Sequence, residues 1–453
     1  MRELEIEIIS REYIKPESPT PNDFKTFKIS LLDQLLPHLY VVPLVYFFKN
    51  DGKSDISKRR ELLKQSLSKT LVHFYPLAGK VKDNLHVDCN DDGMYYVEAR
   101  VNAQLSDFLG HPQQELIHGL LPFHPSSTEL FTKTYVAMVQ VNIFECGGIA
   151  IGIYSSHKVM DGQSTVTFMN AWAATASGSS EEIHPSFISS SIFHPNPKLP
   201  NATSILIPPP QSEQSKSATR RFVFDASALN VLKNNANCAE SNVTNPSRVT
   251  AAMGLIWQCA IATSQARFGF RKPSILTFVV NLRSRNSPPL PPYSMGNIFW
   301  VTYAKCLVNS DLKLPSMVRR VRNGIDKLDN SFLEDIKGKD GSLVNVMKHL
   351  KELEEVHTGN LDTEYLSLSS ICNGGIYNAD FGWGKPIWTC IGSAGIDALG
   401  LPNLVVFMDT RSGDGIEAWV TLKENDMAIF EKIPELLNFA TLDPSPLEIS
   451  LSA

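Results

Sequence analysis

The sequence predicts an α/β fold with mixed sheets, built from two halves that a long connector joins. Helix-like and strand-like segments are mixed in both halves of the 453 residues. A stretch from Ser177 to Arg220 is dense in Ser and Pro, and a connector of that length is uncommon inside one compact domain. No G-x-G-x-x-G pattern follows a first strand and no Walker lysine motif occurs, so a parallel, doubly wound nucleotide fold is not indicated.

The Ser/Pro-rich stretch sets the expected domain boundaries. Proline removes a backbone donor and fixes φ, so neither a helix nor a central strand can persist through it. We therefore expect an N-terminal domain over residues 1–180, a crossover linker over residues 181–220 and a C-terminal domain over residues 221–453.

The first half predicts an amphipathic helix, three strands and a second helix. Leucines recur at helical spacing from Ile56 to Phe74, with lysines and arginines between them, and the helix should end before Pro76. The run that ends at Tyr154 is almost continuously apolar, which is typical of a buried strand. The strands are expected at Met94–Val101, Thr134–Phe144 and Gly148–Tyr154, and the second helix at Gln163–Ala176.

The second half predicts a similar mixture. In chain order we expect a helix at Arg248–Arg267, strands at Ser274–Asn281 and Asn297–Val308, helices at Pro315–Ile336 and Leu343–Val356, strands at Leu404–Asp409 and Gly415–Leu422, and a helix at Met427–Ala440.

Composition excludes several classes of function. The net charge of -5 provides no basic excess for a phosphate backbone, so we expect no nucleic-acid partner. No run of about 18 apolar residues occurs, so no membrane span is expected. The seven cysteines contain no C-x-x-C pair, which favours buried thiols in a reducing compartment. With a first segment too charged for a secretory signal, we expect a cytoplasmic protein.

The most informative segment runs from Tyr154 to Gly162. A buried strand leads into His157, and an Asp-Gly pair begins four residues later at Asp161. Gly162 permits a tight turn where a Cβ would clash. Histidine suits proton transfer because its ordinary pKa of about 6.5 lies near working pH. The segment therefore predicts a histidine presented at a strand end, facing a cleft.

The residues alone leave other interpretations of His157 open. It could be a satisfied structural histidine, it could be oriented directly by Asp161, or Ser155 or Ser156 could act as a nucleophile beside it. Two ligands with no third His, Cys or Glu nearby do not make a zinc site, so the sequence predicts no bound metal.

A second motif, Asp380-Phe381-Gly382-Trp383-Gly384, follows the first about 220 residues later. The two motifs in this order resemble those of the plant BAHD acyltransferase family. Further landmarks of that family extend the resemblance over nearly the whole chain, with Lys80 as one departure where the family often has Arg. They are Pro19-Thr20-Pro21, Leu32-Asp33-Gln34, Tyr75-Pro76-Leu77-Ala78-Gly79, Asn281-Leu282-Arg283-Ser284-Arg285, Gly296-Asn297 and Asp414-Gly415-Ile416-Glu417-Ala418.

The resemblance implies a fold and an activity. The two domains would each be similar to chloramphenicol acetyltransferase, joined by the long crossover, with a channel between them. The enzyme would move an acyl group from a coenzyme A thioester to a hydroxyl or an amine, with His157 in mid-channel as general base. No permanently bound cofactor is expected, and the partners would be acyl-CoA and a small-molecule acceptor, bound by a monomer.

The resemblance also implies roles for other residues. Trp383 and Asn297 carry N–H donors and are candidates to stabilise the oxyanion. Asp161 would turn away from the channel and pair with Arg283, or else with Arg285, and so play a structural part. Asp380 would likewise be structural and hold a loop near the coenzyme entrance. Coenzyme A contacts are expected at Arg248, Thr250, Ser412 and Gly413.

The expected substrate follows from one branch of the family. The chain most resembles a branch that mostly uses acetyl-CoA and acylates alkaloid alcohols. Other acceptors, such as acylsugars, naphthoquinones and terpenoid alcohols, stay open, and so does a catalytically silent, ligand-binding relative. Peptide-forming condensation domains share the His-x-x-x-Asp-Gly element, but they usually carry a second His where this chain has Ser156.

Overall fold

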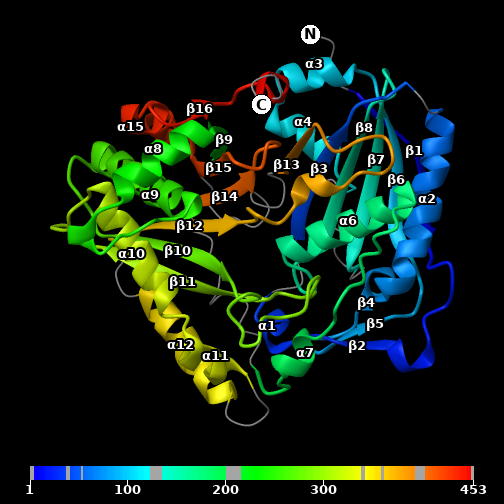
Figure 1. The fold of residues 1–453 in the computed structure, drawn as a ribbon, viewed down its shortest axis with the longest axis horizontal. Coiled ribbons are helices and arrows are strands. Elements are labelled where there is room, and N and C mark those ends of the chain that lie inside the picture. Colours follow the sequence, from blue (N-terminus) through cyan, green and yellow to red (C-terminus); the bar gives the residue numbers. More distant parts are fainter. Residues whose placement is uncertain are drawn as a thin grey trace.

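The computed structural model describes residues 5–36, 41–52, 55–122, 135–199, 216–337, 342–358, 362–392 and 403–449. Two large mixed sheets stand side by side, the first on the right of Figure 1 and the second on the left, and the predicted α/β class with mixed sheets is confirmed. Within the described part of the chain, none of the helices is both long and apolar enough to cross a lipid bilayer.

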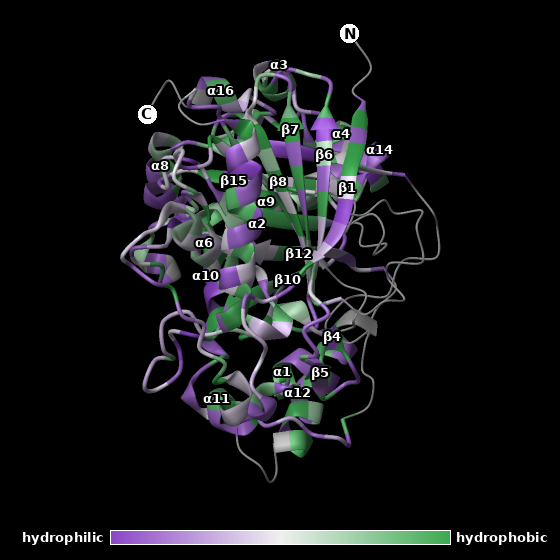
Figure 2. Ribbon diagram, turned by 90° about the vertical axis from the view of Figure 1, so that its right-hand side faces the viewer, coloured by the Kyte–Doolittle hydropathy of each residue, from purple (hydrophilic) through white to green (hydrophobic). Residues whose placement is uncertain are grey.

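The first sheet has the order β1-β6-β7-β8-β3-β13, and only β6 and β7 run parallel. Its edge strand β1 alternates between half-buried and exposed residues up to its buried last residue, whereas β8 is buried along its whole length. Figure 2 shows hydrophilic residues along β1. A strand covered on both faces is expected to be mostly apolar, as β8 is up to Tyr154. The strands are β1 (Ile6–Ile14), β6 (Met94–Val101), β7 (Ala137–Phe144), β8 (Ile149–Ser156), β3 (Val41–Phe48) and β13 (Trp388–Ile391).

The second sheet has the order β11-β10-β12-β14-β15-β9-β16. Its strands β10, β12 and β14 are parallel to one another and the remaining pairs are antiparallel. The strands are β9 (Ser217–Phe224), β10 (Ser274–Asn281), β11 (Phe299–Cys306), β12 (Glu364–Ser370), β14 (Leu404–Asp409), β15 (Ile416–Lys423) and β16 (Thr441–Leu442). A small sheet contains β2 (Thr26–Lys28), β4 (Lys80–Val81) and β5 (His86–Asp88).

Helices of the first half cover its sheet. α2 (Ile56–His73) packs against α6 (Gly162–Ser177), and the indole of Trp172 donates to the Leu63 carbonyl oxygen at 3.1 Å. The predictions of both helices are confirmed. The shorter helices are α1 (Leu31–Gln34), α3 (Leu105–Gly110), α4 (Gln114–Gly119) and α7 (Ser189–Ile192).

Most helices of the second half gather beside the second sheet in Figure 1, whereas α16 (Pro446–Ile449) packs against α3. The others are α8 (Ala226–Ala236), α9 (Arg248–Phe268), α10 (Leu314–Asp326), α11 (Asn330–Ile336), α12 (Ser342–Thr358), α14 (Glu424–Phe430) and α15 (Pro434–Leu437).

Two predicted helices are each divided in the structure. The single helix expected at Pro315–Ile336 is wrong, because Asp329 accepts the N–H of Phe332 and begins α11 as a new helix. The single helix expected to end at Ala440 is also wrong. Pro434 cannot donate a helical hydrogen bond, so it opens the separate short helix α15.

One segment of the second half belongs to the first sheet. β13 pairs with β3, and Trp388 lies opposite Phe47. Phe381, a few residues earlier, is fully buried in the core of the first half. The division at residues 180 and 221 stays a prediction, and this segment crosses it. The first part of the linker runs beside the second half, because Ser186 and Met295 share a backbone hydrogen bond, while residues 200–215 lie outside the described residues.

Candidate active site

His157 lies in a strand–turn–helix segment, directly after β8 and before α6. Asp161 caps the helix, because its Oδ1 accepts the N–H of Ser164 at 2.8 Å. Gly162 is required for a close approach, since an added Cβ would lie 2.5 Å from a methyl carbon of Ile371 in the second half. The expected turn at Gly162 is therefore also the place where the two halves of the chain meet.

The imidazole of His157 has one nitrogen bound and one nitrogen available. Nδ1 lies 2.8 Å from Oδ1 of Asn297. The Asn297 amide nitrogen donates to Oδ1 of Asp33 and to the His157 carbonyl oxygen, both at 2.7 Å. The amide oxygen must therefore face the ring, so Nδ1 carries the hydrogen and donates it. Within the described residues no hydrogen bond reaches Nε2, which keeps its lone pair.

Asn297 does not match the expected oxyanion donor. Both of its amide hydrogens are used, one by Asp33 and one by the His157 carbonyl oxygen. An oxyanion donor needs an N–H directed at the developing charge. The geometry instead makes Asn297 a residue that orients the ring of His157.

Asp161 pairs with Arg283, as the resemblance implied. Two parallel hydrogen bonds of 2.7 and 3.0 Å join the guanidinium to the carboxylate, and both side chains are largely buried. Burial raises the pKa of Asp161, but the Arg283 charge together with the hydrogen bonds from Arg283 and Ser164 outweighs burial and holds that pKa below its ordinary value. The alternative partner, Arg285, donates to the Leu328 carbonyl oxygen instead.

The same pair also anchors the segment that carries Asn297. Arg283 donates to the carbonyl oxygen of Gly296 at 3.2 Å, and Oδ2 of Asp161 accepts the N–H of Ile298 at 3.3 Å. Asp161 therefore acts on His157 indirectly, by fixing the backbone on either side of Asn297.

The four residues expected at coenzyme A lie near one another. Arg248 donates to the carbonyl oxygens of Gly413 and Gly415 and also pairs with Asp409. Thr250 is buried, and its N–H binds Oγ of Ser247 at the start of α9. Ser412, in the same loop as Gly413, donates to the carboxylate of Asp414. The structure thus brings Arg248 and the 412–414 loop together, and their contact with coenzyme A stays a prediction.

A short segment connects this cluster to the histidine motif. Asn373 accepts a hydrogen bond from Arg248 at 2.9 Å, and the next residue, Gly374, accepts one from Gln163 at 3.3 Å. A cavity of about 690 Å³ opens beside this segment, and both Gln163 and Arg283 line it. The cavity has the size of ordinary small-molecule sites, and Arg283 of the Asp161–Arg283 pair forms part of its wall.

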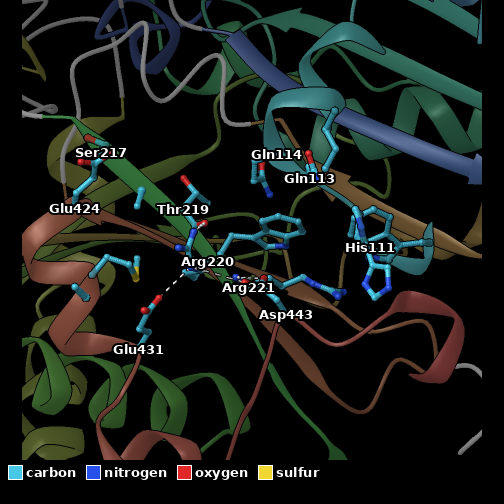
Figure 3. A pocket seen from close by; sticks show the side chains of 17 residues that line it. His111, Gln113, Gln114, Ser217, Thr219, Arg220, Arg221, Glu424, Glu431 and Asp443 are labelled. Carbon is cyan, nitrogen blue, oxygen red and sulfur yellow. Dashed lines mark hydrogen bonds and ion pairs between the residues drawn. The ribbon is translucent and has the colours of Figure 1, made fainter. Parts of the chain in front are cut away.

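A second cavity, of about 610 Å³, lies away from His157. Figure 3 shows Arg220, Arg221 and Glu431 along its wall, with Arg220 Nε 3.0 Å from the Glu431 carboxylate. Trp388 also lines it and pairs with Phe47, at the end of β3 remote from the histidine. This cavity is separate from the candidate active site.

Comparisons with known proteins identify the family of the chain. The model of the Transferase family matches residues 4–437. Limonoid 7-O-acetyltransferase of Citrus sinensis is 39% identical over 98% of this chain and 100% of its own length. Vinorine synthase of Rauvolfia serpentina is 37% identical over 97% and 99% of the two chains. The crystal structure of vinorine synthase superposes with a TM-score of 0.80 at 36% identity, covering 96% of this chain and 98% of that one.

The chain belongs to the BAHD transferase family. It is an O-acyltransferase, and the family expected from the two motifs is confirmed. As a BAHD enzyme it carries the second family motif intact, so the place of that motif relative to His157 can be compared with the expected one.

The second BAHD motif, residues 380–384, packs near the end of the first sheet that is remote from His157. The ring of Trp383 stacks on that of Phe381, which packs edge-on against Phe48. Phe48 pairs with Ile149, the first residue of β8, whereas His157 follows the last. A strand of this length spans roughly 24 Å. This geometry does not favour donation from Trp383 to the oxyanion, and that role stays a prediction.

Asp380 holds this motif as a structural residue. Its Oδ1 accepts the N–H groups of Gly382 and Gly384 at 2.9 and 3.0 Å. Both glycines have positive φ, of 98° and 104°, which a side chain would strain. The expectation that Asp380 fixes a loop agrees with this geometry, and Asp380 also lines the cavity of about 690 Å³.

We expect Trp383→Phe to leave catalysis nearly unchanged. Phenylalanine retains an aromatic ring against Phe381 and removes the indole N–H together with one ring of the indole. Losing an oxyanion donor costs about 10²–10³ in kcat, so a loss of less than about tenfold separates the two roles. Steady-state kinetics of the purified variant would measure it, with wild type as the reference. A loss of several hundredfold with unchanged melting temperature would restore the oxyanion role.

We expect the acid limb of the pH–rate profile to lie below pH 6.5. Burial lowers the pKa of His157 from its ordinary value because it disfavours the imidazolium, and this outweighs the opposing effects of Asn297 and Asp161. A general base must be unprotonated, so activity falls only as the pH drops through this lowered pKa. Measuring kcat/KM between about pH 5 and 9 at constant ionic strength tests this. An acid limb above pH 6.5 would contradict it.

Two residues near His157 were assigned no role from the sequence. Asp33 belongs to the Leu32-Asp33-Gln34 landmark and binds Asn297. Lys158 is 5% exposed, and burial lowers its pKa to about 8. Its ammonium donates to the carbonyl oxygens of Gln34 and Leu36, at the end of α1. Only the tertiary structure places Asp33 beside the histidine and buries the ammonium of Lys158, although the landmark that contains Asp33 was visible in the sequence.

Proposed function

We propose that the enzyme transfers an acetyl group from acetyl-CoA to a hydroxyl of a polycyclic specialised metabolite, an alkaloid or a limonoid. Limonoid 7-O-acetyltransferase is named for such a transfer to a limonoid. The resemblance of the motifs to the acetyl-CoA-using, alkaloid-acylating branch supports the alkaloid alternative. We propose further that the chain is a monomer of the cytoplasm, with domains at residues 1–180 and 221–453, each similar to chloramphenicol acetyltransferase.

The observation that carries this proposal is the state of the His157 ring. Its neighbours Ser155, Ser156 and Lys158 are at most 5% exposed, whereas His157 is half-buried. Nδ1 is bound by Asn297, which leaves Nε2 as the basic nitrogen of the ring. A base so oriented is suited to accept a proton from a bound alcohol.

The chemistry requires one base and no covalent acyl-enzyme. An alcohol is a weak nucleophile near pH 7, so Nε2 of His157 accepts its proton while the oxygen attacks the thioester carbonyl. The tetrahedral intermediate then collapses, the carbon–sulfur bond breaks, and the imidazolium returns the proton to the thiolate. Ser155 is not needed as a nucleophile, and its hydroxyl is bound to that of Thr165 at 2.6 Å in the core.

The donor and the acceptor are tested in one assay. The purified protein is incubated with acetyl-CoA and a panel of alkaloid, limonoid and phenolic alcohols, free thiol release is followed, and the products are identified by mass. We expect thiol release that depends on an alkaloid or limonoid acceptor and disappears in His157→Ala. Parallel reactions with malonyl-CoA and aromatic acyl-CoAs test the donor. Binding of acceptors without thiol release from any donor would instead favour a silent, ligand-binding relative.

A further inference from the structure

The carboxylate of Asp33 is one of the most completely hydrogen-bonded groups near the active site. It lies on α1 and is 1% exposed. Its Oδ2 accepts the N–H and the hydroxyl of Ser30, each at 2.7 Å. Its Oδ1 accepts the backbone N–H and the side-chain amide of Asn297, also at 2.7 Å. One oxygen therefore serves α1, and the other reaches across to the segment that carries Asn297.

The contact with Asp33 decides which way round the Asn297 amide lies. In the observed orientation the NH2 group faces two acceptors, Asp33 Oδ1 and the His157 carbonyl oxygen. In the flipped orientation the amide oxygen would face both acceptors, and its NH2 group would face Nδ1. A negative carboxylate opposite an amide oxygen at this distance is strongly unfavourable in a buried setting.

The orientation of that amide decides which nitrogen of His157 is basic. An amide oxygen can only accept, so Nδ1 must carry the hydrogen and Nε2 the lone pair. An NH2 group in its place would favour the opposite tautomer, with the basic lone pair on Nδ1. The hydrogen bond at one ring nitrogen sets the state of the other.

We propose that Asp33 is a positioning residue for acyl transfer, which orients the amide of Asn297 and so keeps Nε2 of His157 as the base. The proposal rests on the proposed function of His157. Contacts fix both ends of α1: Ser30 caps its start, and Lys158 binds the carbonyl oxygens of Gln34 and Leu36 at its end. Lys158 directly follows His157, so its hydrogen bonds fix the end of α1 relative to the residue that carries the base.

Asp33→Asn and Ser30→Ala form a matched pair of variants for the test. Both disturb the capping box at the start of α1, but only Asp33→Asn removes the charge that orients Asn297. We expect Asp33→Asn to lower kcat at least about tenfold with little change in KM for either substrate, because only the proton transfer suffers. Ser30→Ala should lower the melting temperature while kcat stays within about twofold of wild type. Equal losses of kcat in the two variants would overturn the proposal.

The tautomer of His157 gives a readout that does not depend on turnover. Nuclear magnetic resonance of protein with 15N-labelled histidine distinguishes a ring protonated on Nδ1 from one protonated on Nε2, and the His157→Gln variant assigns the signal. We expect Nδ1–H in wild type and in Ser30→Ala, and loss of that preference in Asp33→Asn. A wild-type tautomer in Asp33→Asn would overturn the proposal. If wild type acylates no acceptor, the proposed function fails while this measurement still decides the tautomer.

A double variant tests the amide argument by exchanging the two side chains. In Asp33→Asn with Asn297→Asp, the new amide donates to the new carboxylate, whose other oxygen can still accept from Nδ1, but the hydrogen bond from position 297 to the His157 carbonyl oxygen is lost. We expect kcat above that of either single variant, and an acid limb shifted to higher pH, because the adjacent carboxylate favours the imidazolium. If the fold-loss of kcat in the double variant equals the product of the fold-losses in the two single variants, the two side chains are not coupled and the argument is contradicted. If the double variant does not fold, the tautomer in Asp33→Asn decides alone.

Discussion

Replacing His157 with alanine is expected to lower kcat by about 10²–10⁴, the usual cost of removing a positioned general base. The expected cause is chemical, because Nε2 is the only basic atom that the geometry assigns to the reacting hydroxyl. His157 is half-buried, and loss of its ring removes one hydrogen bond to Asn297. We therefore expect the variant to fold, with KM values for acyl-CoA and acceptor close to those of wild type.

The measurement is a thiol-release assay on His157→Ala and His157→Gln, with His184→Ala as the control. His184 is an exposed histidine whose side chain lies against Glu182, so its loss should leave kcat unchanged. Circular dichroism and thermal melting confirm that each variant is folded. Activity of His157→Gln within tenfold of wild type would show that another group takes the proton.

The second large effect is expected from Asp161→Ala, which should cost about 3–5 kcal/mol of stability because it leaves the buried Arg283 charge without a partner. Activity should also fall, since the segment of Gly296 and Ile298 loses its contacts and Asn297 no longer orients the ring. The loss is one of positioning, not of a proton relay. Thermal melting and steady-state kinetics on the same preparation measure both parts.

Arg285→Ala is the matched control for this pair, because Arg285 lies two residues from Arg283 and contacts only the Leu328 carbonyl oxygen among the bonds described. It should keep nearly full activity. Since Arg283 holds the pKa of Asp161 below its ordinary value, the stabilisation is present above the unfolded carboxyl pKa of about 3.9 and is lost as the pH falls below it. Full thermal stability of Asp161→Ala at pH 7 would contradict this account.

Much of the fold and part of the site could be predicted from local patterns. The long apolar run gave β8, and leucines at helical spacing gave α2, because both signals depend only on neighbouring residues. The breaks at Asp329 and Pro434 were missed, although a capping residue and a proline stood in the sequence. The pairing of Asp161 with Arg283 was expected from the family resemblance and is present.

The roles of Trp383 and Asn297 show where such prediction stops. Each carries an N–H donor, which is known from the residue type, but the sequence does not reveal which atom that donor contacts. Trp383 packs against Phe381 at the far end of the first sheet, and Asn297 has both amide hydrogens engaged. Whether a donor is free to stabilise an oxyanion depends on its neighbours in space, and the two acceptors bound by Asn297 lie more than a hundred residues away in the chain.

By itself the sequence determined the class of fold and the family of the enzyme and predicted His157 as the base, because these follow from residue types, local spacing and the order of two motifs. The tertiary structure alone decided that Asp33, Asn297 and His157 form one hydrogen-bonded chain across the two halves. The physical reason is that a tautomer is selected by the donor or acceptor placed against the ring. Only folding brings that atom to within 2.8 Å of Nδ1.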